Sequence, residues 1–176
     1  MIDAEKKKEA KSNFDSYLSQ GLLRKEQNNI SKEMYIKNAE QSLQLAIDLQ
    51  SSPLKPYLWI IVISYYSMFY IANAVLLSLG YKVGNKIAHQ VTNDALIVLV
   101  LDRLKKEMLE EYEQTRNDAL EIASIKSDDV IHTYYQELDK RSKFQYNMLE
   151  QTKQSLAETS INRAKEFIFE MKKLIR

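Results

Sequence analysis

The chain has 176 residues, of which 45% are hydrophobic and 28% charged, a composition typical of one folded domain and unlike that of a disordered segment. Its 25 basic and 24 acidic residues leave a net charge of +1, so any binding to nucleic acid would require a local basic patch. The absence of cysteine excludes disulfide scaffolds, cysteine-ligated zinc, iron–sulfur clusters and thiol catalysis. Because the N-terminal segment is charged and leads into no apolar secretory core, we expect a cytoplasmic location.

Apolar residues recur at helical spacing along almost the whole chain, and no segment shows the sustained alternation expected of a strand. With 3 Gly and 2 Pro, the chain also has few of the turn residues that a sheet protein needs. The first predicted helix covers residues 3–27, and the second begins after Ser31 as its N-cap. We therefore predict an all-α fold: a single-domain up-and-down bundle of five to seven helices, with residues 1–30 as an N-terminal helical extension and residues 31–176 as the bundle.

No charged residue lies between Lys55 and Lys82, and most of the residues between them are apolar. A stretch of this kind is long enough to be a membrane-spanning helix. The polar residues spread through it, such as Ser64 and Asn73, favour the alternative, a helix that is apolar on all sides because it lies at the centre of a bundle. We therefore expect a buried core helix that ends at Gly80, and no membrane partner.

Three more helices are predicted in the second half of the chain. An apolar stripe from Val91 to Tyr112 marks the first of them. The pattern is interrupted over residues 125–129, where an aspartate can cap the next helix. Stripes over residues 131–152 and 157–175 mark the other two.

Few residues in the sequence offer catalytic chemistry. The two histidines, His89 and His132, lie far apart, and neither belongs to a metal-binding pattern. The three glycines are isolated from one another, so there is no glycine-rich phosphate loop, and no nucleophile elbow is present. We therefore expect neither a metal nor a cofactor.

Arg141 is a charged residue on a helical stripe, with Tyr134, Leu138 and Met148, that otherwise suits burial. A charge that points toward a core is costly unless it is paired or reaches a wet groove. A guanidinium can hold a phosphate with two parallel hydrogen bonds, so a phosphate site is one interpretation. The other is an ion pair with a neighbouring helix, or a side chain whose stem extends to solvent.

Tyr65, Tyr66 and His89 also have two interpretations each. Buried tyrosines usually pack in a core with their hydroxyls hydrogen-bonded, but an exposed ring can stack on a base of single-stranded RNA. His89 lies near a predicted helix start, where a phosphate is favoured, although a single histidine there is more often structural.

The segment from Ser64 to Gly80 resembles the hallmark helix of HEPN-domain proteins, in which a tyrosine pair, a further aromatic residue, small residues and a leucine run precede a glycine. His89 matches a histidine often found shortly after that glycine. The segment from Arg141 to Tyr146 resembles the later arginine motif of the family, and the closing apolar run resembles its terminal helix. The resemblance covers about residues 34–175.

This resemblance implies a helical bundle, often a homodimer, with the arginine motif at a cleft near the dimer axis. Many members are RNases of toxin–antitoxin, phage-defence or CRISPR systems, and others act beside a minimal nucleotidyltransferase. The site residues implied are Arg141 and Tyr146 as catalytic residues if the chain is active, and Tyr65, Tyr66, His89 and Gln145 as residues that bind RNA or nucleotide.

The sequence departs from the RNase members of the family in its arginine motif. Those members carry a histidine four to six residues after the arginine, whereas this chain has Tyr146 there and no histidine nearby. A tyrosine, with an ordinary pKa near about 10, is a poor general acid or base near neutral pH. Residues five apart on an unbroken helix also diverge by about 140°, so Arg141 and Tyr146 would share a cleft only with a bend or a partner subunit. The stretch from Lys105 to Tyr135 is longer than in compact members.

These observations leave three hypotheses for the function. The first is an RNA- or nucleotide-binding HEPN protein without strong catalysis, acting with a nucleotidyltransferase or a toxin–antitoxin or defence partner. The second is a metal-independent endoribonuclease toxin that uses Arg141 to stabilise phosphate charge, with Tyr146, His89 or His132 in proton transfer. The third is a structural helical interaction module.

Overall fold

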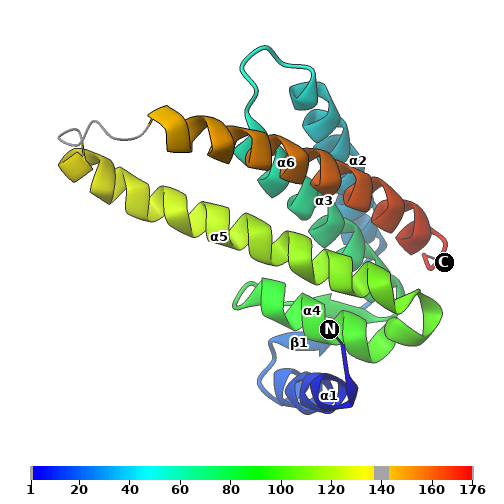
Figure 1. The fold of residues 1–176 in the computed structure, drawn as a ribbon. Coiled ribbons are helices and arrows are strands. Elements are labelled where there is room, and N and C mark those ends of the chain that lie inside the picture. Colours follow the sequence, from blue (N-terminus) through cyan, green and yellow to red (C-terminus); the bar gives the residue numbers. More distant parts are fainter. Residues whose placement is uncertain (1, 137–142, 176) are drawn as a thin grey trace.

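The computed structural model describes residues 2–136 and 143–175, with side chains described for residues 2–121 and 152–175. Over these ranges the chain forms six α-helices, one 3₁₀-helix and two short strands (Figure 1). In chain order they are α1 (Ala4–Ser19), β1 (Leu23–Lys25), α2 (Asn29–Gln50), α3 (Tyr57–Ser78), β2 (Tyr81–Val83), α4 (Ala88–Leu99), η1 (Leu101–Arg103), α5 (Lys106–Gln136) and α6 (Lys143–Lys172). The predicted all-α class is confirmed, and the number of helices lies within the predicted range.

Helix α3 lies at the centre of the molecule, with its most extensive contacts to α2 and α6 and further contacts to α4 and α5. Residues such as Ile60, Met68, Ile71 and Leu76 are completely buried. In the described part of the chain, α3 is the one helix long and apolar enough to cross a membrane, and 72% of its most apolar window is buried inside the protein. This burial accounts for the uncharged stretch of the sequence, because a helix surrounded by other helices has no face for charges.

Helix α1 lies at one end of the molecule, against α4 (Figure 1). Phe14 and Tyr17 form its buried face, together with Ala10. The helix begins after Asp3, whose carboxylate accepts a 2.8 Å hydrogen bond from the backbone N–H of Lys6 and so satisfies one free donor of the first turn. The extension therefore packs directly on α4, the next α-helix after the central one.

A two-stranded antiparallel sheet joins the extension to the bundle, and this sheet was not predicted. Strand β1 pairs with β2 in the register Leu23↔Val83 and Lys25↔Tyr81. Each strand has three residues, too few to show an alternating pattern in the sequence. Gly84 lets the two segments approach closely, since a Cβ at this position would lie 3.1 Å from the carbonyl oxygen of Leu22.

The end of α3 was predicted correctly and the start of α2 was not. Gly80 follows the C-cap Leu79 with a φ of 87°, the left-handed conformation that favours glycine. The N-cap of α2 is Asn28, whose side chain accepts a 2.9 Å hydrogen bond from the N–H of Ser31. Ser31, the predicted cap, is instead the third residue of the helix. Asparagine and serine both favour the N-cap position, and Asn28 comes first in the chain.

The helix predicted from the stripe between Val91 and Tyr112 is two helices, α4 and α5, separated by η1. The stripe continues across the break because both helices bury their apolar residues in one core, so periodicity alone does not reveal the turn between them. The interruption predicted at residues 125–129 is absent, since α5 continues to Gln136. Serine and aspartate favour caps, but their cost inside a helix is small, so they do not have to end one.

Candidate functional site

A cavity of about 430 Å³ lies between α1, α4 and α5. Most of the side chains that line it are polar or charged, so it suits a polar or charged ligand better than an apolar one. They are Lys6, Glu9, Ala10 and Asn13 from α1, Ile87, His89, Gln90, Asn93 and Asp94 from α4 and its N-cap, and Glu113, Arg116 and Leu120 from α5.

His89 is held in place by Tyr65 of the central helix. The Tyr65 hydroxyl lies 2.7 Å from Nδ1 of His89. Burial raises the pKa of Tyr65 far above its ordinary value, so the phenol keeps its proton and can donate it to Nδ1. With Nδ1 as the acceptor, the proton of the neutral imidazole is carried by Nε2, the other ring nitrogen. Tyr65 therefore fixes the orientation of His89, and when its hydroxyl donates to Nδ1 the ring presents Nε2–H to the cavity.

Aromatic rings enclose the imidazole on its other sides. The ring centroid of Phe69 lies 4.5 Å from that of His89, and the centroid of Tyr66 lies 5.7 Å away. Burial in these surroundings lowers the pKa of His89, and the positive charge of Arg116 lowers it further. The imidazole is therefore neutral near neutral pH.

The lowered pKa of His89 predicts a change of stability with pH. Because the unfolded chain binds a proton at the ordinary pKa of 6.5 and the folded chain resists it, His89 contributes stability above that pH and loses it as the pH falls toward the folded pKa. As the pH is lowered through 6.5, the ordinary pKa of histidine, we expect the free energy of unfolding to fall more steeply for the wild type than for His89→Gln. Urea unfolding at a series of pH values measures this, and parallel curves for the two proteins would contradict it.

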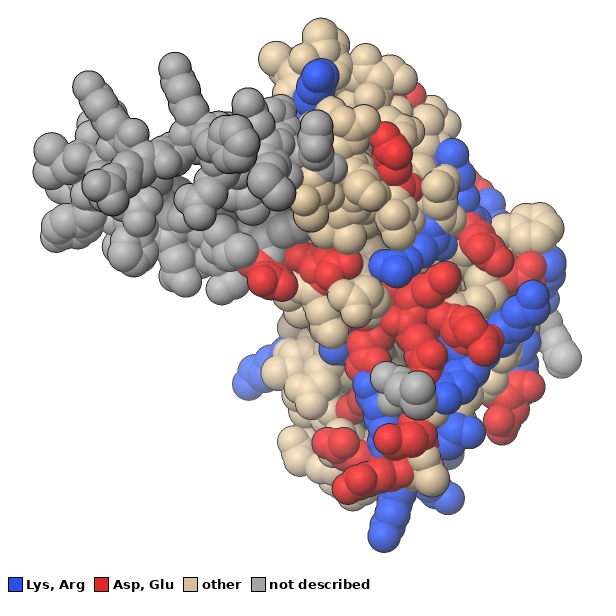
Figure 2. Space-filling view, viewed as in Figure 1, with Lys and Arg blue, Asp and Glu red and all other residues tan. Residues whose placement is uncertain are grey.

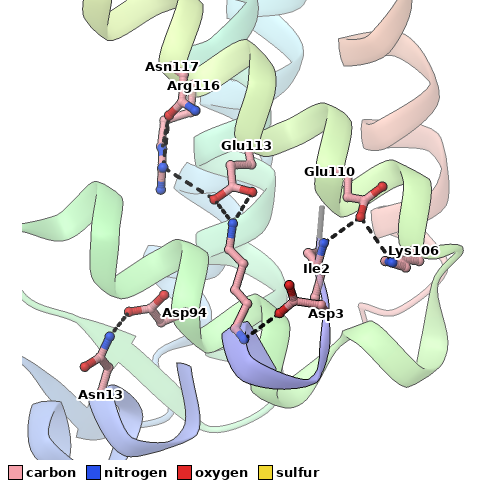
Figure 3. Close-up of polar contacts among 10 residues, drawn as sticks. Ile2, Asp3, Asn13, Asp94, Lys106, Glu110, Glu113, Arg116 and Asn117 are labelled. Carbon is pink, nitrogen blue, oxygen red and sulfur yellow. Dashed lines mark hydrogen bonds and ion pairs between the residues drawn. The ribbon is translucent and has the colours of Figure 1, made fainter. Parts of the chain in front are cut away.

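Arg116 brings a guanidinium to the same cavity. Its side chain is 16% exposed and lies 3.7 Å from a carboxylate oxygen of Glu113. Its Nε and Nη2 atoms donate hydrogen bonds of 3.3 and 3.0 Å to the side-chain oxygen of Asn117 (Figure 3). These contacts occupy one edge of the guanidinium, and the side chain also lines the cavity beside His89. A planar cation held this way is suited to a phosphate.

The carboxylate of Asp94, on α4, forms hydrogen bonds with two side chains of α1. The residue is 8% exposed, and its carboxylate accepts hydrogen bonds of 2.9 Å from the Tyr17 hydroxyl and 3.0 Å from the Asn13 amide. Burial, together with the Asp94 charge, raises the pKa of Tyr17, so this hydroxyl stays a donor. Among the side chains described, no cluster of three or more potential ligands is arranged to hold a metal ion.

Ile87, at the rim of the cavity, has a backbone conformation that its side chain disfavours. It is the N-cap of α4, with a φ of 45°, and its side chain is 52% exposed. A β-branched residue in the left-handed region costs about 1–3 kcal/mol, and such strain is found most often at functional sites.

The strain at Ile87 predicts an unusual order of stability among its variants. Glycine adopts the left-handed conformation without strain. Alanine loses almost as much of the isoleucine side chain as glycine does, but its Cβ keeps the strain in place. We expect the free energy of unfolding of Ile87→Gly to exceed that of Ile87→Ala by about 1 kcal/mol, the reverse of the usual order of these residues. Urea titration of both variants measures the difference, and a more stable alanine variant would contradict the prediction.

The structure places two of the residues predicted for the site, His89 and Tyr66, next to each other, and it gives Tyr65 a different role from the predicted one. His89 lines the cavity, and Tyr66 lies beside it with 39% of its side-chain surface exposed. Tyr65 is 1% exposed, so its ring cannot stack on a base and it contacts the site through His89. Arg141 lies outside the described residues, and so do the side chains of Gln145 and Tyr146.

Arg116 was missed because it lies in a charged segment that reads as a solvated helix face. A signal for it exists in the sequence. Steps of four lead from Met108 and Tyr112, both buried, directly to Arg116. The same test that singled out Arg141, a charge on a buried stripe, identifies Arg116 as well.

Comparison with known proteins identifies the family of the chain. The family model for the HEPN domain matches residues 32–174. No curated protein and no solved structure gives a significant match to the chain. The match takes in the central helix α3, His89 and Arg116, and it leaves out α1 and β1. HEPN domains are generally associated with nucleotides or RNA. Since the match spans most of the chain, this protein belongs to the HEPN family.

Proposed function

We propose that the protein binds single-stranded RNA at the cavity between α1, α4 and α5, without strong catalysis of its own. The observation that carries this proposal is that the guanidinium of Arg116 and the imidazole of His89, from two different helices, line one cavity. Membership of a family associated with RNA and nucleotides supports the same class of ligand.

The polar groups of the cavity suit a phosphodiester. Arg116 supplies a permanent positive charge and several N–H donors, and His89 has its Nε2–H available because Tyr65 occupies Nδ1. A neutral imidazole donates to a phosphate oxygen without adding a second buried charge next to the guanidinium. The pair therefore provides two donors from different directions for one phosphate group.

The surroundings of the cavity suit an unpaired base. Tyr66 is partly exposed beside His89, and two apolar side chains at the cavity, Ile87 and Leu120, are 52% and 43% exposed. An aromatic ring next to a phosphate site is the usual arrangement for stacking a splayed base of single-stranded RNA. The bases of a duplex are stacked inside the helix and do not reach such a ring.

The surface charge does not supply a general attraction for RNA. On the face shown in Figure 2, acidic side chains gather near the middle and basic side chains lie around them, with no broad basic area. Binding should therefore involve few phosphates and depend on the cavity itself.

Fluorescence anisotropy with a labelled single-stranded oligoribonucleotide tests this proposal. We expect saturable binding, with little competition from a duplex of the same sequence and with an affinity that falls as salt is raised. Equal competition by duplex and single strand would contradict the proposed base contact, and no binding at low salt would remove the proposal as a whole.

A second candidate function, metal-independent cleavage of RNA, is favoured by the state of His89. The imidazole is neutral near neutral pH and lies in the same cavity as Arg116. In the other tautomer, in which Nδ1–H donates to the Tyr65 hydroxyl, Nε2 could accept the proton of an attacking 2′-hydroxyl while the guanidinium stabilises the charge on the phosphate. A 2′,3′-cyclic phosphate would form, and the 5′-oxygen would leave with a proton from water. Incubating RNA with the purified protein and a chelator tests this candidate. Cleavage that is lost in His89→Gln and Arg116→Ala supports it, and intact RNA with all three proteins excludes it.

We also propose, from family membership alone, that the chain forms a homodimer and acts with a minimal nucleotidyltransferase or a toxin–antitoxin or defence partner. The mass of the purified protein in solution, measured by light scattering, tests the first part. Co-purification of a nucleotidyltransferase from the native host tests the second. A monomeric mass would contradict the homodimer, and purification without any such partner would contradict the paired system.

A further inference from the structure

Helix α1 forms one wall of the cavity although it lies outside the part of the chain that matches the HEPN family. Together with Ile2, which precedes it, α1 contacts α5 at two points. The backbone N–H of Ile2 donates a 2.6 Å hydrogen bond to Glu110, and the ammonium group of Lys6 forms an ion pair with Glu113 (Figure 3). About two turns further along the same face of α1, Asn13 donates to Asp94 of α4. The extension is thus held in a defined position at the site.

Glu113 lies between two cations of the cavity. Its carboxylate contacts Lys6 from α1 and lies 3.7 Å from a nitrogen of Arg116, one turn further along α5. The side chain of Lys6 is 29% exposed, that of Glu113 is 15% exposed and that of Arg116 is 16% exposed. The three groups are therefore mostly enclosed but still open to the cavity. A carboxylate between an ammonium and a guanidinium occupies the kind of position that a phosphate takes when it binds two cations.

We infer that Lys6 is a second phosphate-binding residue of the site, supplied by the N-terminal helix, and that Glu113 competes with the RNA for Lys6 and Arg116. The inference rests on the proposed function. When RNA binds, the phosphate replaces Glu113 as the anion beside the two cations, and Lys6 moves from the carboxylate to the phosphate. The extension thereby increases the number of phosphates, or of phosphate oxygens, that the site can contact.

Opposite effects of two substitutions separate this inference from a structural ion pair. If the pair only holds α1 in place, Lys6→Gln and Glu113→Gln break the same contact and change RNA binding in the same direction. If Lys6 binds phosphate and Glu113 competes, Lys6→Gln removes a cation from the RNA, whereas Glu113→Gln frees two. The first variant should then bind RNA more weakly and the second more tightly.

Anisotropy titrations of the full chain with single-stranded oligoribonucleotide, at a series of salt concentrations, test the inference. We expect Lys6→Gln to bind about tenfold more weakly and to lower the slope of log K against log salt by about 0.7, the value for one lost phosphate contact on a single strand. We expect Glu113→Gln to bind severalfold more tightly. Lys6→Arg, which keeps the charge, should bind nearly as well as the wild type.

Lys8→Gln is the matched control, because Lys8 is exposed on the same helix and outside the cavity lining. Its affinity for RNA should stay within about twofold of that of the wild type, and its slope of log K against log salt should be nearly the same, because the charge of an exposed distant lysine is screened. Equal binding by Lys6→Gln and Lys8→Gln would overturn the inference while leaving the proposed function intact, and so would weaker binding by Glu113→Gln. Absence of RNA binding by the wild type would overturn both. Circular dichroism of each variant verifies that α1 and the bundle remain folded.

Discussion

Substitution of Arg116 by alanine is expected to lower the affinity for single-stranded RNA by about ten- to a hundredfold. Arg116 is the residue of α5 that we expect to contact the phosphate, and its charge is permanent. A hydrogen bond to a charged group contributes about 1.5–3 kcal/mol, which corresponds to this loss of affinity. Anisotropy titration at fixed salt measures the change. Arg116→Lys should recover only part of the affinity, because an ammonium cannot form the two parallel bonds of a guanidinium.

Arg103→Ala provides the control for this prediction. Arg103 is exposed in η1 and does not line the cavity, so its removal changes the net charge equally without touching the site. We expect its affinity to stay within about twofold of the wild type, since distant surface charges are screened. A similar loss in Arg103→Ala and Arg116→Ala would mean that RNA responds to overall charge and that the cavity is not its site.

Substitution of Ile71 by alanine is expected to lower the free energy of unfolding by about 2–5 kcal/mol. Ile71 is completely buried in α3, in contact with the core that all the other helices share, so the loss of its side chain leaves a cavity at the centre of the bundle. Urea unfolding followed by circular dichroism measures the change, with the slope of the transition as a test that the unfolded state is unaltered.

Leu54→Ala is the matched aliphatic control, since Leu54 is 85% exposed in the turn before α3. We expect it to change the free energy of unfolding by no more than about 0.5 kcal/mol. If the two variants lost similar stability, α3 would not be the centre of the core. If both lost little, the apolar stretch would be serving another environment, such as a lipid phase.

The central part of the fold could be predicted from the sequence because its signal is continuous. A long uncharged segment with scattered polar residues has few alternatives to a core helix, and the structure buries it. Gly80 marked the end of that helix through a conformation that other residues disfavour. These features are local, so they can be read from neighbouring residues.

Pairings between distant residues could not be predicted in this way. Leu23 pairs with Val83 in the small sheet, and Lys6 contacts Glu113, which is 107 residues away. Three-residue strands and surface charges leave no periodic pattern, so no sequence signal connects one partner with the other. The division of the Val91–Tyr112 stripe into two helices was missed for a related reason, since both helices face one core.

The site shows the same division between local and distant information. His89 and the tyrosine pair were singled out by sequence, and the structure gives them different tasks: Tyr65 orients the imidazole and Tyr66 faces solvent beside it. Arg116 was hidden in a charged segment, and its relation to His89 depends on how α4 and α5 pack. The assignment of Arg141 and Tyr146 as catalytic residues stays a prediction.

The central claim is that RNA binds where His89 and Arg116 meet, and nuclear magnetic resonance of the histidine ring tests it most directly. The ¹⁵N and ¹³C signals of His89, assigned by their absence in His89→Gln, report from inside the cavity. We predict that a single-stranded oligoribonucleotide shifts these signals saturably, with the same dissociation constant that anisotropy gives, and that Arg116→Ala weakens the response. RNA binding that leaves the His89 signals unchanged would contradict the claim and place the binding surface elsewhere on the chain.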